Sequence, residues 1–73
     1  MSCSLYWKPS GSGNQVGDAA LRNAVEKHFG RRAWLDYDSL EFLRGLAAAG
    51  IEGASELIEA IERHERIEVY QEC

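Results

Sequence analysis

The residues of this chain that could do chemistry are two cysteines and two histidines, widely separated in the sequence. Cys3, Cys73, His28 and His64 supply four zinc-ligand groups, or a thiol–imidazole pair for nucleophilic catalysis. A zinc site usually draws two ligands from one closely spaced pair, which this spacing lacks. A thiol–imidazole pair needs proximity and a third orienting group, neither of which the sequence shows. We therefore expect reduced structural or surface thiols, and no catalytic residue, metal or cofactor.

A glycine-rich segment is the second candidate for chemistry. Gly11, Gly13 and Gly17 stand before an expected helix, where phosphate-binding loops present backbone amides to an anion. No Lys-Ser/Thr pair follows, and Asp18 places a carboxylate where the phosphate would lie. We interpret residues 10–17 as a flexible connector.

Basic side chains gather where the first expected helix ends, and they could bind phosphates or an acidic partner. Alternatively, they complement the helix dipole and stay solvated. Trp34 follows closely, and basic–aromatic surfaces are common at interfaces. The alternative hypothesis for function is therefore nucleic-acid binding through Lys27, Arg31 and Arg32.

Residues 46–61 superficially resemble two DNA-binding hairpins. In a helix-turn-helix the second helix would present glutamates to the DNA phosphates, which repel them. In a helix-hairpin-helix, Glu52 would replace the second glycine. Neither motif is satisfied, so we expect a hairpin that only packs.

Hydrophobic periodicity predicts the elements that must position these residues. Alternation of apolar and polar residues predicts two terminal strands, and helical spacing predicts three helices. The fold class is therefore α+β, with the helices packed on one face of a small sheet that contains both terminal strands. The sequence leaves the strand direction open; only an antiparallel pair in register would bring Cys3 near Cys73. The predicted helices are 18–29, 39–49 and 53–64, and the predicted strands are 2–8 and 66–71. Residues 32–35 could add a short third strand at an edge of the sheet.

Capping residues predict how the helices begin and end. Asp18 is a candidate N-cap of the first helix. Asp38 followed by Glu41 fits a capping box for the second, with Tyr37 and Phe42 at the positions of a hydrophobic staple. The expected helix ends are glycines: Gly30 closes the first helix and Gly50, followed by Ile51, closes the second.

Length, composition and charge limit the class of protein. Seventy-three residues, 45% hydrophobic and 27% charged, make one domain over 1–73 and exclude a dinucleotide-binding or two-domain enzyme. We find no apolar run long enough to span a membrane and no secretory signal, so we expect a cytoplasmic protein. Residues 1–35 carry five basic and two acidic side chains, and residues 36–73 carry three basic and ten acidic ones. The acidic half argues against nonspecific binding to nucleic acid or an anionic membrane.

With no catalytic or metal site predicted, we expect any function of this chain to depend on residues at its surface. If the helices cover one face of the sheet, tyrosines and charged residues remain on the other, an amphipathic combination enriched at interfaces. Cross-strand pairing that merely stabilises the sheet is the alternative. We expect a noncatalytic protein-interaction module, typical of small bacterial or phage accessory or regulatory proteins, and exposed edge strands would also permit a homodimer. The predicted contact residues are Tyr6, Lys8, Glu68 and Tyr70 on the sheet, and Glu52, Glu56 and Glu59 on the acidic third helix.

Overall fold

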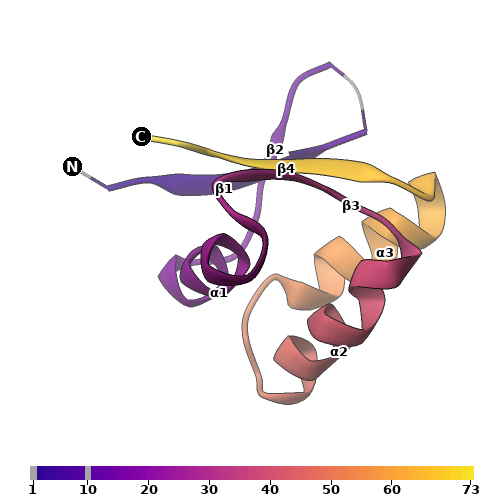
Figure 1. Cartoon of the computed structure of the whole chain (residues 1–73). Coiled ribbons are helices and arrows are strands. Elements are labelled where there is room, and N and C mark those ends of the chain that lie inside the picture. The colour runs from indigo at the N-terminus through magenta and orange to yellow at the C-terminus, as the bar shows by residue number, and fades with distance from the viewer. Residues whose placement is uncertain (1, 10) are drawn as a thin grey trace.

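Three helices cover one face of a four-stranded antiparallel sheet in a computed structural model that describes residues 2–9 and 11–73 (Figure 1). The predicted α+β class and the predicted helical layer are confirmed. None of the helices in these described ranges is long and apolar enough to cross a membrane. In chain order the elements are β1 (Ser4–Lys8), β2 (Asn14–Gln15), α1 (Ala19–Phe29), β3 (Arg32–Leu35), the 3₁₀ helix η1 (Tyr37–Ser39), α2 (Leu40–Ala48), α3 (Ala54–His64) and β4 (Ile67–Glu72).

The last strand of the chain occupies the middle of the sheet. The strand order is β2-β1-β4-β3, and every neighbouring pair is antiparallel. Tyr6 of β1 lies opposite Tyr70 of β4, and Trp34 of β3 lies opposite Glu68. This register brings the two ends of the chain side by side, as Figure 1 shows. The predicted third strand at 32–35 is confirmed as β3.

The predicted connector at residues 10–17, of which Ser10 lies outside the described residues, was wrong in one respect. Asn14 and Gln15 form β2, which pairs with β1, and the next residue, Val16, is buried in the core. Two residues are too few to show the alternation that identifies a strand. The glycine and serine content of this segment therefore predicts only a loop that connects two elements. That Asn14 and Gln15 form a strand depends on their pairing with β1, which lies elsewhere in the sequence.

The start of α2 also differs from the prediction. Asp36, and not Asp38, is the capping residue: its carboxylate accepts from the Asp38 N–H, and its own N–H donates to the Ser39 hydroxyl. The cap serves the 3₁₀ turn η1, and α2 begins only at Leu40. Phe42 stacks on the His28 ring, while Tyr37 is exposed, so the predicted hydrophobic staple is replaced.

The other predicted helix ends agree with the structure. The Asp18 carboxylate accepts from the Ala20 N–H at the start of α1. After α2, the Ile51 N–H donates to the Leu46 carbonyl and the Gly50 N–H to the Ala47 carbonyl, each at 3.0 Å. This is the paired-bond glycine cap, and it needs the positive φ of 81° that Gly50 adopts.

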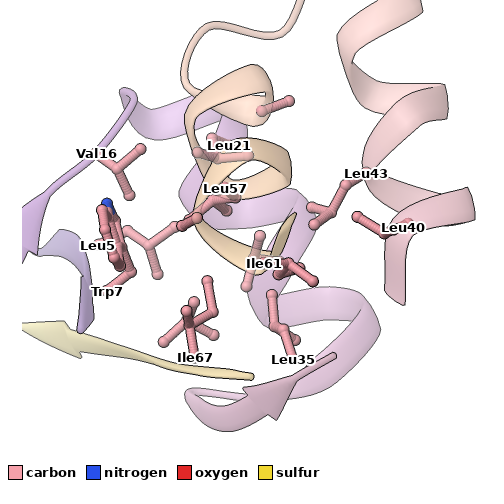
Figure 2. Close-up of a cluster of buried hydrophobic side chains, with 14 residues drawn as sticks. Leu5, Trp7, Val16, Leu21, Leu35, Leu40, Leu43, Leu57, Ile61 and Ile67 are labelled. Carbon is pink, nitrogen blue, oxygen red and sulfur yellow. The ribbon is translucent and has the colours of Figure 1, made fainter. Parts of the chain in front are cut away.

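The core lies between the sheet and the helices (Figure 2). Leu5 and Trp7 point into it from β1, and Ile67 and Val69 point into it from β4, as their alternation predicts. Aliphatic side chains from all three helices and from β3 complete the cluster. The fully buried members with the largest side chains are Leu21, Val25, Leu35, Leu43, Leu57, Ile61, Ile67 and Val69.

Candidate functional site: the outer face of the sheet

The face of the sheet away from the helices carries aromatic and charged side chains from three neighbouring strands. Because side chains alternate along a strand, the residues between the core residues all point outward. Within the described residues, the helices all lie on the other face (Figure 1). Among the outward residues are Tyr6 and Lys8 on β1, Glu68 and Tyr70 on β4, and Arg32 and Trp34 on β3.

Glu68 is the ionic centre of this face. Its carboxylate is held by the Arg32 guanidinium at 2.8 Å, with the Lys8 ammonium at 4.0 Å on the other side. Lys8 lies opposite Glu68 on β1, and Arg32 lies two positions from it across the β3 pair. Although no helix covers it, Glu68 is only 9% exposed. Two cations from the flanking strands therefore compensate a carboxylate that is nearly buried.

Tyr70 is covered in the same way by neighbouring side chains. Its ring stacks on that of Tyr6 at 5.7 Å between centroids. The Lys8 ammonium and the Arg32 guanidinium lie 5.2 and 5.1 Å from the Tyr70 centroid, within the range of a cation–π contact. Tyr70 is only 7% exposed as a result.

The segment leading into β2 completes this cover. It lies on the side of the sheet away from the helices (Figure 1). A Cβ at Gly13 would lie 1.9 Å from the Tyr70 hydroxyl oxygen, so the glycine backbone sits directly against the phenol. The structure thus places the four predicted contact residues together, but it corrects their expected exposure: Glu68 and Tyr70 are buried, and Tyr6 and Lys8 are half-buried.

The open part of this face lies at its β3 edge. Trp34 is 50% exposed and Tyr37, just after the strand, is 54% exposed; they are the exposed large hydrophobic residues of the described chain. The Arg66 guanidinium lies over the Trp34 ring, 4.4 Å from its centroid. We call Trp34 and Arg66 the Trp34 surface. Tyr37 is close to Trp34 in the sequence but lies on η1. The sequence raises the possibility of an edge strand around Trp34, and the sheet order places β3 at an edge. The contact of Trp34 with Arg66 is what sequence reasoning missed.

The acidic helix provides the other predicted protein-binding surface. Glu56 and Glu59 on α3 are exposed, as expected for a solvated helix face, and Glu52 is exposed in the turn before the helix. Glu56 has a structural role, however, because its carboxylate accepts from the Trp7 indole N–H at 2.7 Å. It satisfies the one polar group of a tryptophan that is otherwise in the core.

The basic residues of the nucleic-acid hypothesis lie in different parts of the molecule. Lys27 lines a shallow hollow of about 420 Å³ on the helical side, with Ala24, His28, Phe42 and Leu46. Arg32 lies on the opposite face, in its ion pair with Glu68. The Arg31 guanidinium lies 3.7 Å from the Cys73 sulfur at the end of β4. Lys27 and Arg32 therefore lie on opposite faces of the sheet.

The glycines of the predicted connector also have packing roles. Gly17 and Gly53 bring two loops into backbone contact: a Cβ on Gly53 would lie 2.7 Å from the Gly17 Cα. Both have positive φ, 66° and 92°. Close approach of two chain segments explains these glycines without an anion.

The cysteine prediction was wrong. Cys3 and Cys73 form a disulfide, one position beyond the last β1–β4 pair, Ser4 with Glu72. The in-register antiparallel arrangement brings the sulfurs together, which could be recognised only once the strand direction was known. His28 stacks on Phe42, and His64 lies 6.1 Å from the Trp7 ring between centroids. Over residues 2–9 and 11–73, no group of three or more His, Cys, Asp or Glu side chains is placed to hold a metal.

Comparisons with protein-family models, with curated proteins and with solved structures gave no match to this chain.

Proposed function

We propose that this protein is a noncatalytic protein-interaction module, and that its contact surface is the Trp34 surface. The observation that carries the proposal is the exposure of Trp34 on an edge strand, beside Arg66, whereas Tyr70 on the same sheet face is buried and Tyr6 is half-buried. Tryptophan, tyrosine and arginine are the residue types most enriched where binding energy concentrates. The proposal includes the accessory or regulatory role in a bacterium or phage that the sequence suggested.

The Trp34 surface replaces the surface predicted from the sequence. Tyr70 and Glu68 make their contacts within the chain, so little of either side chain is left for a partner. Trp34 keeps half its surface exposed. Its contact with Arg66 restrains a ring that a partner could then cover at a lower cost in side-chain entropy.

Photo-crosslinking tests the proposal even while the partner is unidentified. A photoreactive phenylalanine analogue replaces Trp34 in one form of the chain and Ala48, exposed on α2, in a control form. Irradiation in the source lysate is expected to give protein adducts from position 34 and far fewer from position 48. Equal yields from the two positions, or none from position 34, would overturn the proposal. An adduct that is digested by nuclease would support the nucleic-acid hypothesis instead.

The disulfide bears on the location of the protein in the cell. A cytoplasmic protein is expected to keep its thiols reduced, whereas disulfides persist in oxidising compartments. The Cys3–Cys73 bond therefore argues against the cytoplasmic location expected from the sequence. Counting free thiols in protein isolated under denaturing conditions with an alkylating agent distinguishes the two: two free thiols per chain indicate the cytoplasm, and none indicates an oxidising compartment.

A further inference from the structure

The backbone of β3 has hydrogen-bonding groups that point away from the sheet, and their identity follows from the register. The Val16 N–H donates to the Leu5 carbonyl at 3.0 Å, so the backbone groups of Leu5 point toward β2. In an antiparallel sheet the direction alternates from one residue to the next. The backbone groups of Tyr6 and Lys8 therefore point the other way, toward β4.

The same alternation carries across β4. Glu68 and Tyr70 pair with Lys8 and Tyr6, so their backbone groups point toward β1, and those of Ile67 and Val69 point toward β3.

The alternation then reaches β3. Ala33 and Leu35 pair with Val69 and Ile67, so their backbone groups point inward to β4. The N–H and C=O groups of Arg32 and Trp34 consequently point to the open edge of the sheet.

Nothing in the described part of the chain occupies these four groups. The strand order ends at β3, and no turn, loop or cap hydrogen bond of residues 2–9 and 11–73 involves the backbone of Arg32 or Trp34. The next outward-pointing residue, Asp36, is already used, because its N–H donates to Ser39 Oγ and its carbonyl accepts from the Ser39 N–H. The available edge is therefore short and has defined ends.

We infer that this edge pairs with β3 of a second copy of the chain, antiparallel and centred on Ala33, to form one continuous eight-stranded sheet. The inference rests on the proposed function, since it identifies the partner of the Trp34 surface. Centring the two-fold axis on Ala33 places Arg32 opposite Trp34 of the second copy, and Trp34 opposite its Arg32. All four outward groups of each chain then find partners, which gives four hydrogen bonds. Centring the axis on Trp34 would satisfy only the groups of Trp34 itself.

The side chains favour a second copy over an unrelated strand. Arg32 and Trp34 both point outward on the same face, two residues apart. A two-fold antiparallel pair therefore sets each Arg32 side chain, which keeps its guanidinium on Glu68, beside the other copy's indole in a self-complementary contact. The two Arg32 side chains are diagonal neighbours in this register. Their mutual repulsion is reduced because each is ion-paired with Glu68 of its own chain. Pairing would also cover the exposed tryptophan at the edge.

Backbone amide exchange and sedimentation equilibrium test the inference on the wild-type chain. As the protein concentration rises, the mass is expected to approach that of two chains. Exchange at the Arg32 and Trp34 amides should slow by about tenfold or more, while the Ala33 and Leu35 amides, bonded to β4, should change little. The inference would be overturned if the protein kept the mass of a single chain up to about millimolar concentration. A dimer that forms only above that concentration would be too weak to count as specific. A dimer in which the Arg32 and Trp34 amides still exchange freely would also overturn the inference.

Two substitutions separate the backbone contribution from the side-chain contribution. Trp34→Pro removes an edge N–H that β4 does not use, and proline is tolerated on an edge strand. Trp34→Thr keeps the N–H and a β-branched side chain but removes the ring. We expect the proline form to be monomeric and the threonine form to dimerise more weakly than wild type. Circular dichroism checks that each variant is folded. If the proline form is unfolded, the exchange of the Arg32 and Trp34 amides in the wild type still tests whether the β3 edge pairs.

The crosslinking experiment distinguishes the failure of this inference from the failure of the proposed function. An adduct of twice the chain's mass from position 34 supports the second copy. Adducts only with a different protein, together with a monomeric wild type, overturn the inference and leave the proposed function standing. No adduct from position 34 removes both.

Discussion

The two faces of β4 are buried to nearly the same degree, but by different kinds of contact. Ile67 and Val69 face the helices and are 0% and 1% exposed, whereas Glu68 and Tyr70 face away from the helices and are 9% and 7% exposed. The inner pair is covered by aliphatic side chains from other elements. The outer pair is covered by side chains of the two strands beside it and by the Gly13 backbone. A sheet face without helices is therefore not automatically a binding surface, because a central strand is shielded by its own neighbours.

The largest effect is expected on the inner face. Leu57→Ala removes a fully buried side chain from α3 and should lower the free energy of unfolding by about 2–5 kcal/mol. Urea unfolding measures this loss, and Ile58→Ala, at the adjacent half-buried position, is the matched control with a smaller expected loss. A loss below about 1 kcal/mol at Leu57 would mean that the helical layer contributes less than its burial implies.

The disulfide tests how far the pairing of β1 and β4 depends on a covalent link. Cys3 and Cys73 are 70 residues apart in sequence, so the bond restricts the unfolded chain strongly. Replacing both by serine should cost about 2–4 kcal/mol. The wild type in excess reductant should unfold at the same urea concentration as the double-serine form in the same buffer. A double-serine form as stable as the oxidised wild type would show that side-chain packing on the two faces is sufficient.

Gly13→Ala tests the packing of the outer face directly. The new methyl would meet the Tyr70 phenol, which is held in its stack with Tyr6. We expect a loss of about 1–3 kcal/mol, as for overpacking of an interior. Gly13→Ala in a Tyr70→Phe background removes the closest contact, and part of the loss should disappear. Additive losses in this double-mutant cycle would contradict a direct contact between the two residues.

Much of the inner face was predictable from the sequence, because it depends on local periodicity. The alternation of Leu5 and Trp7 and the helical spacing of Leu57 and Ile61 are visible in short segments, and each correctly indicates its buried side. The cap at Gly50 is equally local.

The outer face and the chain ends were less predictable, because they depend on which strands are neighbours. The burial of Glu68 requires Lys8 and Arg32 on either side of it, and their pairing follows from the strand order. The Cys3–Cys73 bond similarly follows from the antiparallel register. None of these relations leaves a periodic signal along the chain, and the same holds for the open β3 edge on which the proposed contact depends.

The smallest expected effect is that of Glu68→Gln, and it tests the ionic part of the outer face. The glutamine keeps the shape and a hydrogen-bond acceptor for Arg32, but it removes the charge that Arg32 and Lys8 share. Because the Arg32 side chain is 64% exposed, solvent screens much of the attraction, and we expect a loss of about 1 kcal/mol or less. Stability measured at low and high salt should show a smaller salt dependence in the variant than in the wild type. A loss as large as that of Leu57→Ala would mean that the carboxylate organises the outer face as strongly as the aliphatic core organises the inner one.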